Sequence, residues 1–215
     1  MLDSKIILPV ITDLSVTELK GKKILLRLDL NVPIEGGQVI EDFRIINSLP
    51  TIKYLREAGA RVVIVSHLGR KPVETLLPVA HWLEQSFPVT FCPEVTKLKA
   101  MVSELEDGGV LLLENIRRET GEESNDDHLA KRLTNGMDLY VNDAFASSHR
   151  AHASIVGVTH YLPSFAGLQF TKEIVNLAKA FEPAHPFLII LGGAKFETKL
   201  PLLERFLPLV DKIVI

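Results

Sequence analysis

Histidine and arginine side chains gather in the stretch VNDAFASSHRAHAS (residues 141–154), where His149, Arg150 and His152 follow Asp143. Two histidines three positions apart, with a carboxylate nearby, could form a metal site, a catalytic acid–base pair or part of a solvated loop. Arg150 lies between the histidines and would repel a bound cation, and the sequence has no HExxH or cysteine-pair motif. These residue types therefore favour anion binding over a metal site.

Polar side chains follow three other apolar runs in a similar way. They are Asp29 and Asn31 after 22–28, His67 and Arg70 after 61–66, and Arg117 and Arg118 after 109–114. The carboxyl ends of parallel strands share one edge of a sheet, so we expect these side chains to lie near Arg150. Arg44, in EDFRI, could join them. Guanidinium groups bind carboxylate and phosphate through two parallel hydrogen bonds, so a small, multiply charged anion is the predicted ligand.

Each of these residues also has an ordinary structural explanation. A single arginine is more often a surface salt-bridge partner than a ligand, and Asp29 could equally cap a turn. His152 fits a structural role better than a catalytic one, Gly69 suits a tight turn, and Trp82 is more typical of a core. Separate salt bridges would not place similar residues after four different strands, and this agreement favours the anion site.

Apolar runs rich in valine, isoleucine and leucine alternate with amphipathic stretches, as in strands that helices cover on both faces. We expect strands at 22–28, 61–66, 88–92, 109–114, 138–142, 187–191 and 211–215. We expect one helix to start at Asn47 or Ser48 with Pro50 in its first turn, and others at 77–86, 126–136, 172–181 and 199–207. The order predicts an α/β fold: a three-layer α/β/α sandwich with a parallel Rossmann-like sheet.

The segment PSFAGLQFTKE (163–173) is typical of a joint between two parts of a chain, because proline, glycine and small polar residues precede a helical pattern. We therefore predict a first domain at 1–168 and the start of a second, incomplete α/β domain at 169–215. The two strands expected there would leave open edges, so this tail could be mobile or self-associate.

The composition, 47% hydrophobic and 24% charged residues in 215, is typical of a soluble globular protein. No apolar run approaches the ~20 residues of a membrane-spanning helix, and the N-terminus does not resemble an export signal. Cys92 is the only cysteine, which favours a reducing cytoplasm. The net charge of −3 gives no general attraction to nucleic acid.

Paired glycines also occur in LGGAKFETK (191–199), between an expected strand and an expected helix. Such glycines let backbone N–H groups approach a phosphate, and the two lysines are one helical turn apart. The motif is not a Walker A loop, and an ordinary tight turn explains it about as well.

Six motifs in order, RLDLNVP, EDFRI, SHLGR, LLLENIR, DAFASSHRAHAS and LGGAKFETK, resemble the phosphoglycerate kinase family across all 215 residues. The resemblance implies a glycolytic two-domain α/β kinase. Such an enzyme transfers a phosphoryl group between 1,3-bisphosphoglycerate with ADP and 3-phosphoglycerate with ATP, the nucleotide carrying Mg²⁺.

The resemblance also implies roles for individual residues. Asp29 and Asn31 would position the glycerate, and Arg44 would stabilise the phosphoryl group in flight. The remote phosphate and its surroundings would involve His67, Leu68, Gly69, Arg70, Arg117 and Arg150. The nucleotide phosphates would contact Gly192, Gly193, Lys195 and Lys199, and Lys199 could also follow the transferring group. Apart from the resemblance, the comparison of strand ends leads us to expect that Asp143 orients the loop around Arg150.

The chain departs from the family pattern in places. Arg118 stands where the family usually has an aromatic residue, the loop after SHLGR is shorter, and Ala146–Ser147 replaces Gly-Thr. The family's aspartate for the Mg²⁺–nucleotide is not in these residues, so no metal ligand is predicted here and we expect negligible turnover from the 215 residues alone. The alternatives are a non-catalytic phosphoglycerate-binding fragment and one piece of a split enzyme; full-length members are typically monomeric.

Overall fold

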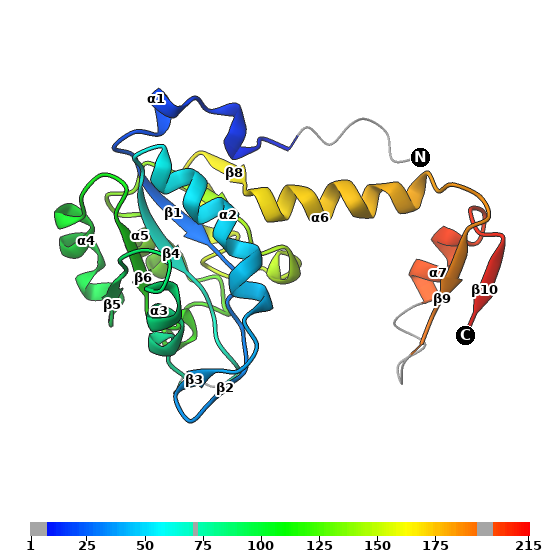
Figure 1. Ribbon diagram of the computed structural model, residues 1–215, viewed down its shortest axis with the longest axis horizontal. Coiled ribbons are helices and arrows are strands. Elements are labelled where there is room, and N and C mark those ends of the chain that lie inside the picture. Colours follow the sequence, from blue (N-terminus) through cyan, green and yellow to red (C-terminus); the bar gives the residue numbers. More distant parts are fainter. Residues whose placement is uncertain (1–7, 71–72, 193–199) are drawn as a thin grey trace. The chain divides into compact units, whose positions relative to one another are not determined.

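The computed structural model describes residues 8–70, 73–192 and 200–215 (Figure 1). The chain forms two compact units, of which the first ends at Thr171 and the second begins at Lys172. The predicted division after residue 168 falls close to this boundary. No helix in the described ranges has the length and apolar character needed to cross a membrane.

A six-stranded parallel sheet forms the centre of the first unit, with the strand order β5-β6-β4-β1-β7-β8. Five of its strands fall within the predicted ranges: β1 (Lys23–Arg27), β4 (Arg61–Val65), β5 (Thr90–Cys92), β6 (Val110–Leu113) and β7 (Leu139–Asn142). The sixth, β8 (Ser164–Ala166), was not predicted, because its three residues lie in the segment interpreted as a joint.

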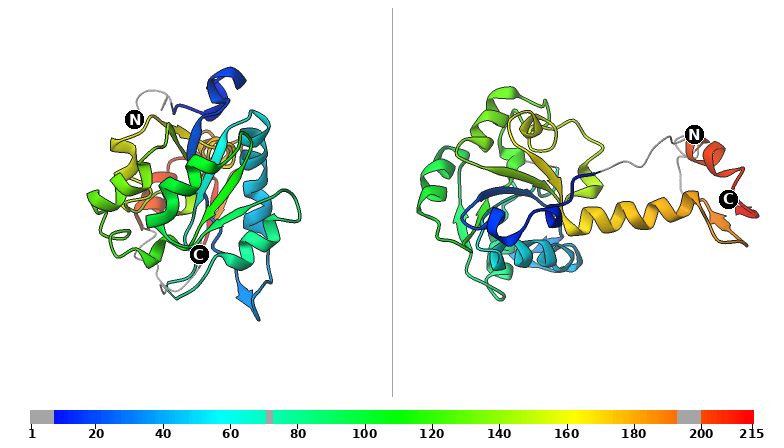
Figure 2. Two further views of the ribbon diagram at one scale, coloured as in Figure 1. Left: turned by 90° about the vertical axis from the view of Figure 1, so that its left-hand side faces the viewer. Right: turned by 90° about the horizontal axis from the view of Figure 1, so that it is seen from above.

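Helices cover both faces of this sheet (Figures 1 and 2). On one face, Ile24 and Leu26 share a core with α2 (Phe43–Glu57) and α3 (Leu77–Leu83). On the other face, Leu25 packs in a core with α4 (Val95–Glu104) and α5 (Asp127–Thr134). Successive residues of a strand point to opposite faces, so β1 contributes to both cores. The predicted three-layer α/β/α arrangement is confirmed.

The predicted start of one helix was wrong, and another helix was missed. Helix α2 begins at Phe43 rather than at Asn47 or Ser48, and Pro50 lies inside it. Burial of Ile45, Ile52 and Leu55 on the sheet outweighs the single hydrogen bond that proline removes. Helix α4 was missed, although Val95, Leu98 and Val102 follow helical spacing and form its buried face. The predicted helices at 77–86 and 126–136 are shorter, ending at Leu83 and Thr134.

The remaining elements of the first unit are short. A hairpin joins β2 (Ile34–Glu35) to β3 (Gln38–Val39), and α1 covers Val16–Leu19. Single 3₁₀ turns lie at Ile11–Asp13, Ile116–Arg118, Phe145–Ser147 and Gly157–His160. Two of these turns directly follow β6 and β7, where the predicted anion-binding residues lie.

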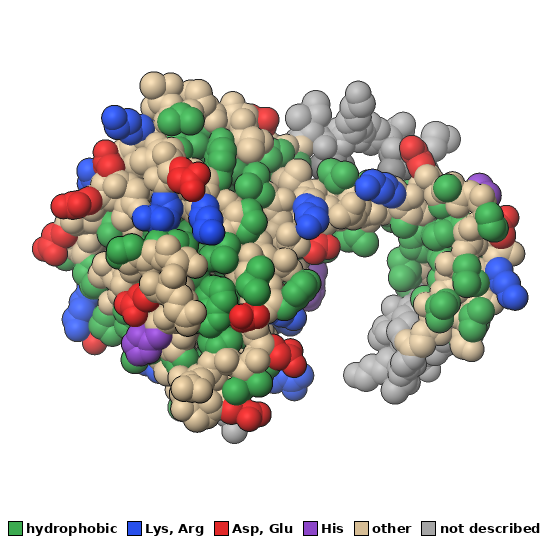
Figure 3. Space-filling view, viewed as in Figure 1, with side chains coloured by type: hydrophobic (Ala, Val, Ile, Leu, Met, Phe, Trp, Pro, Cys, Tyr) green, Lys and Arg blue, Asp and Glu red, His purple; other side chains and the backbone are tan. Residues whose placement is uncertain are grey.

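The second unit contains a two-stranded parallel sheet of β9 (Leu188–Ile190) and β10 (Lys212–Val214), with α7 at Leu200–Phe206. Helix α6 (Leu168–Ala178) crosses the boundary between the units and starts earlier than the predicted residue 172; a 3₁₀ turn at Lys179–Phe181 follows it. Large hydrophobic side chains are exposed on this unit (Figure 3), including Leu188, Ile190 and Leu207.

Candidate anion-binding site

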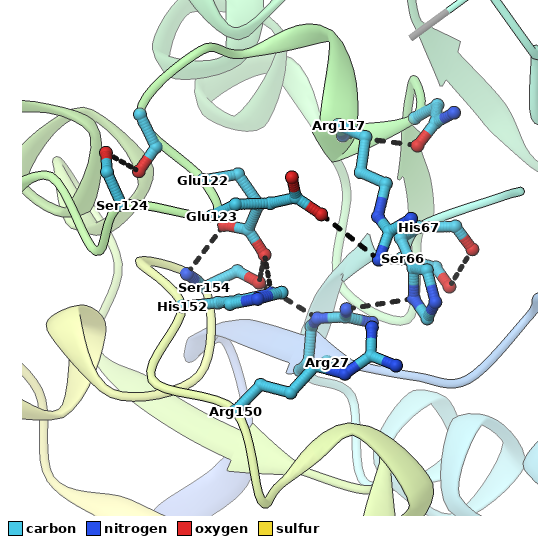
Figure 4. Close-up of polar contacts among 12 residues, drawn as sticks. Arg27, Ser66, His67, Arg117, Glu122, Glu123, Ser124, Arg150, His152 and Ser154 are labelled. Carbon is cyan, nitrogen blue, oxygen red and sulfur yellow. Dashed lines mark hydrogen bonds and ion pairs between the residues drawn. The ribbon is translucent and has the colours of Figure 1, made fainter. Parts of the chain in front are cut away.

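The carboxyl ends of β6, β4, β1 and β7, four adjacent strands, bring three of the predicted side chains and Arg27 to one edge of the sheet. Arg27 is the last residue of β1, His67 follows β4, Arg117 follows β6, and Arg150 lies in the loop after β7. Figure 4 shows these four side chains turned toward one another. His67, Arg117 and Arg150 therefore lie together as expected, whereas the side chain that joins them from β1 is Arg27, which was not predicted.

Arg27 is the most buried of these cations, with 1% of its surface exposed. Its Nε donates a hydrogen bond to the Ser154 hydroxyl (2.9 Å), and its Nη2 donates to Nδ1 of His67 (3.2 Å). Burial lowers the pKa of Arg27, and the nearby Glu122 carboxylate opposes this effect. The sequence signal for Arg27 was a charged residue directly after the apolar run 24–26.

Glu122 supplies the negative charge that accompanies Arg27, and it too is almost completely buried. Its carboxylate accepts hydrogen bonds from the Ser154 hydroxyl (2.6 Å) and from the Ser154 backbone N–H (2.9 Å). Ser154 thus links the carboxylate to the guanidinium, as Figure 4 shows. Glu122 balances the charge of Arg27, so the further positive charge of the site comes from Arg117 and Arg150. Neither Glu122 nor Ser154 was predicted.

Arg117 combines two contacts with one unused donor. Its Nη1 donates to the backbone carbonyl of Gly69 (2.6 Å), and its Nη2 lies 3.3 Å from Oε1 of Glu123. Its Nε is buried and has no hydrogen-bond partner among the described residues. A buried N–H without a partner costs free energy, so an anion that accepts this hydrogen bond would be favoured.

The loop that carries Gly69 is fixed by neighbouring side chains. Asn115 accepts a hydrogen bond from the Leu68 N–H (3.1 Å) and donates to the Leu68 carbonyl (2.9 Å), while Asn31 accepts from the Gly69 N–H (2.8 Å). Gly69 has φ of +60°, and a Cβ atom there would lie 1.4 Å from Oε2 of Glu74. The predicted tight turn at Gly69 is confirmed, and its left-handed backbone conformation favours glycine.

Arg118, which departs from the family pattern, stabilises the same loop from another side. Its Nη1 lies 3.1 Å from Oε2 of Glu114, a buried carboxylate. Glu114 also accepts hydrogen bonds from the Thr75 hydroxyl (2.7 Å) and the Leu76 N–H (2.8 Å). Arg118 therefore partners a loop anchor and does not belong to the cluster around His67.

His67 is neutral in this setting. Burial is the main cause that lowers its pKa to about 3, and the charges of Arg27, Arg117 and Arg150 lower it further. A neutral imidazole can donate a hydrogen bond to an anion without adding a further charge to three nearby guanidinium groups.

We expect acid to destabilise the protein partly through His67. In the unfolded chain the pKa of His67 is about 6.5. As pH falls below that value, His67 becomes protonated in the unfolded state but stays neutral in the folded state. The free energy of unfolding should therefore fall by up to about 1.4 kcal/mol per pH unit between about pH 6.5 and pH 4. Urea denaturation of wild type and His67→Gln across this range measures the difference.

Equal slopes for the two proteins in that experiment would contradict a depressed His67 pKa. Asp143 contributes with the opposite sign, because burial raises the pKa of its carboxyl and favours the protonated folded state at low pH. Asp143 is present in both proteins, so its contribution cancels from the comparison.

The side chains of the loop after β7 contact different partners. Arg150 is exposed, and its Nε donates to Nε2 of His149 (3.4 Å). His152 has Nδ1 3.6 Å from Oε1 of Glu122, and burial lowers its pKa.

The prediction that Asp143 orients this loop needs correction. Its carboxylate accepts from the Thr51 hydroxyl (2.6 Å) and the Phe170 N–H (2.8 Å), so it holds the start of α6.

The other predicted site residues lie around this cluster or outside the described residues. Arg44 forms an ion pair with Asp29 in the loop after β1, and Arg70 is exposed. Gly192 is exposed, whereas Gly193, Lys195 and Lys199 fall outside the described ranges. No group of three or more histidine, cysteine, aspartate or glutamate side chains in the described part of the chain is arranged to hold a metal ion.

A parallel sheet with helices on both faces, whose carboxyl edge gathers arginines from neighbouring strands, defines an α/β protein of the doubly wound class. The family model for phosphoglycerate kinase matches residues 11–215, and the chain belongs to this family. The phosphoglycerate kinase of Fervidobacterium nodosum is 45% identical over 208 residues, which are 92% of this chain and 52% of that protein. That of Dictyoglomus turgidum is 45% identical over 214 residues, 95% of this chain and 54% of that protein.

Solved structures of the family agree with the fold. The phosphoglycerate kinase of Coxiella burnetii superposes with a TM-score of 0.83 at 36% identity, covering 96% of this chain and 53% of that one. The enzyme from Pyrococcus horikoshii gives a TM-score of 0.84 at 33% identity, covering 95% and 54%. The chain thus spans about half the length of these relatives.

Proposed function

We propose that this chain provides the 3-phosphoglycerate-binding part of a phosphoglycerate kinase, which transfers a phosphoryl group between 1,3-bisphosphoglycerate with ADP and 3-phosphoglycerate with ATP. The observation that carries the proposal is the cluster at four adjacent strand ends, where a buried N–H of Arg117 has no partner among the described residues and lies beside a neutral His67. Family membership supports the same conclusion.

Each side chain has a part suited to its chemistry. The phosphate remote from the reacting carboxyl is bound by His67, Arg70, Arg117 and Arg150, together with the loop at Leu68 and Gly69. Asp29 and Asn31 position the glycerate, and Arg44 stabilises charge on the phosphoryl group during transfer. Phosphoryl transfer depends mainly on positioning and electrostatic stabilisation, so such residues suffice on the acid-substrate side.

The nucleotide side of the proposal rests on the resemblance of LGGAKFETK to the family motif. The Mg²⁺–nucleotide is a substrate of the reaction, and its phosphates are contacted by Gly192, Gly193, Lys195 and Lys199. In this proposal residues 1–168 are the domain for the acid substrate and 169–215 begin the nucleotide domain. We also propose a cytoplasmic setting, which the single, buried Cys92 supports.

Removing the Arg150 side chain should weaken binding of 3-phosphoglycerate about 10- to 100-fold, the usual range for a charged hydrogen-bonding partner. Arg150 is exposed, so Arg150→Ala should leave stability nearly unchanged. Calorimetric titration of the 215-residue chain with 3-phosphoglycerate measures the loss.

Arg61→Ala is the matched control for this measurement. Arg61 starts β4 and pairs with Asp107 (3.0 Å), at the opposite edge of the sheet from the cluster. Its removal should leave the affinity unchanged. Equal affinities of the Arg150→Ala and Arg61→Ala proteins would remove the support for the proposed phosphate site.

Glu123 should compete with the substrate for Arg117. Its carboxylate lies 3.3 Å from Arg117 Nη2 but is 63% exposed, so the pair is worth at most about 1 kcal/mol. Glu123→Gln should therefore bind 3-phosphoglycerate up to about fivefold more tightly. The control is Glu119→Gln, since Glu119 pairs with Arg132 and not with the cluster. Weaker binding by Glu123→Gln would show that the carboxylate helps the site rather than blocking it.

A further inference from the structure

The contact between Arg27 and His67 determines which ring nitrogen carries the proton. A guanidinium group has donors only, so Nδ1 of His67 must accept the hydrogen bond from Arg27 Nη2 (3.2 Å). A protonated Nδ1 would place two donors against each other. The ring is therefore neutral, and its single proton lies on Nε2.

Arg27 can impose this state because its own position is fixed. Its Nε is bound to the Ser154 hydroxyl, its Nη1 donates to the Leu28 carbonyl, and its side chain is buried. The Ser154 hydroxyl accepts from Arg27 and donates its own proton to Glu122 (2.6 Å), so its orientation is determined. Hydrogen bonds link His67, Arg27, Ser154 and Glu122 in that order, and each of these bonds thus has a defined donor and a defined acceptor.

We propose that Ser154 and Glu122 are positioning residues for the anion site, which act through Arg27 to hold His67 in the neutral Nε2–H tautomer. The inference rests on the proposed function for the identity of the anion, 3-phosphoglycerate. The described residues give the His67 ring no hydrogen bond besides that with Arg27, so Nε2–H remains as a donor for the phosphate.

The charged groups around His67 explain why a fixed tautomer matters. Arg27, Arg117, Arg150 and His152 all disfavour a positive charge on the ring, so His67 contributes to binding only as a neutral donor. The other tautomer would present an unprotonated Nε2, whose lone pair repels a phosphate oxygen. Holding the proton on Nε2 therefore converts a potentially repulsive contact into a hydrogen bond.

Nitrogen-15 NMR of the labelled 215-residue chain tests the tautomer directly. In the ligand-free wild type at pH 7, we expect a protonated signal at His67 Nε2 and an unprotonated signal at Nδ1. In Ser154→Ala, Arg27 loses its Nε acceptor, and a mixture with the Nδ1–H tautomer should appear.

Ser148→Ala is the matched control. Its hydroxyl is in the same loop but bonds to the Ala144 carbonyl (2.9 Å) and Asn142 (3.0 Å), and the His67 spectrum should be unchanged.

A second pair of variants keeps the test decisive if Ser154→Ala does not fold. The side-chain nitrogen of glutamine reaches about as far as Nε2 of histidine, whereas that of asparagine reaches only as far as Nδ1. His67→Gln should keep affinity for 3-phosphoglycerate within about threefold, and His67→Asn should lose about tenfold, the worth of one hydrogen bond to a charged group.

The outcomes separate this inference from the proposed function. An Nδ1–H or charged ring in the wild type, unchanged His67 signals in Ser154→Ala, or tighter binding by the His67→Asn protein than by the His67→Gln protein would overturn the inference even if 3-phosphoglycerate binds. A fixed Nε2–H tautomer without any binding of 3-phosphoglycerate would instead overturn the proposed function and leave the tautomer assignment standing.

Discussion

Replacing Arg27 with methionine is expected to lower the free energy of unfolding by about 3–5 kcal/mol, although methionine fills much of the same space. The reason is that Glu122, which is 1% exposed, would remain buried without its positive partner. The Ser154 hydroxyl would also lose the donor that it accepts from at 2.9 Å. Urea or guanidinium denaturation of the 215-residue chain at neutral pH gives the difference.

Two controls distinguish this mechanism from general damage to the core. Arg27→Met combined with Glu122→Gln should recover most of the loss, because no buried charge is then unpaired. Arg61→Met, which breaks a partly exposed pair with Asp107, should cost less than about 1 kcal/mol. A double variant as unstable as Arg27→Met would show that the packing of Arg27, and not its charge, supports the fold.

In a protein that extends to the full length of the relatives, Arg44→Ala should lower kcat about a thousandfold while weakening 3-phosphoglycerate binding much less. Arg44 pairs with Asp29 in the structure, so the ground state already has a partner for its charge. We expect the guanidinium to be needed when charge develops on the transferring phosphoryl group, where an arginine contributes several kcal/mol.

Comparison of kcat with substrate affinity tests this assignment. Arg44→Lys is the matched variant, because it keeps the charge but lacks the planar pair of donors, and it should recover only part of the rate. Equal losses in binding and in kcat for Arg44→Ala would contradict a role specific to the transition state.

The central strands could be predicted from the sequence because both of their faces are buried. Continuous apolar runs such as VLLL in β6 produce that pattern without ambiguity. Strand β8 (SFA) lies in a segment of proline, glycine and small polar residues and has no continuous apolar run. Helix α2 extends N-terminal to the predicted start because tertiary burial outweighs the preference of Pro50 for a first turn. Helix boundaries depend on such contacts, which no local pattern contains.

The candidate site could be predicted only where residues directly follow apolar runs. His67 and Arg117 closely follow such runs, Arg150 lies in the loop after one, and the structure brings all three together with Arg27. Glu122 and Ser154 lie in polar segments that look solvent-exposed in the sequence, yet both are buried because they face Arg27 from positions far along the chain. Charge pairing over such separations becomes visible only when the chain is folded.

The depressed pKa of His67 has a consequence for how binding varies with pH. Arginine side chains stay charged far above neutral pH, and His67 stays neutral down to about pH 3. Arg117, Arg150 and His67 therefore present the same charge to the ligand from mildly acidic to alkaline solution. A phosphate monoester, in contrast, loses its second proton near pH 6. Any rise in affinity around that pH would report the ionisation of the substrate, because the charge of these three side chains does not change there.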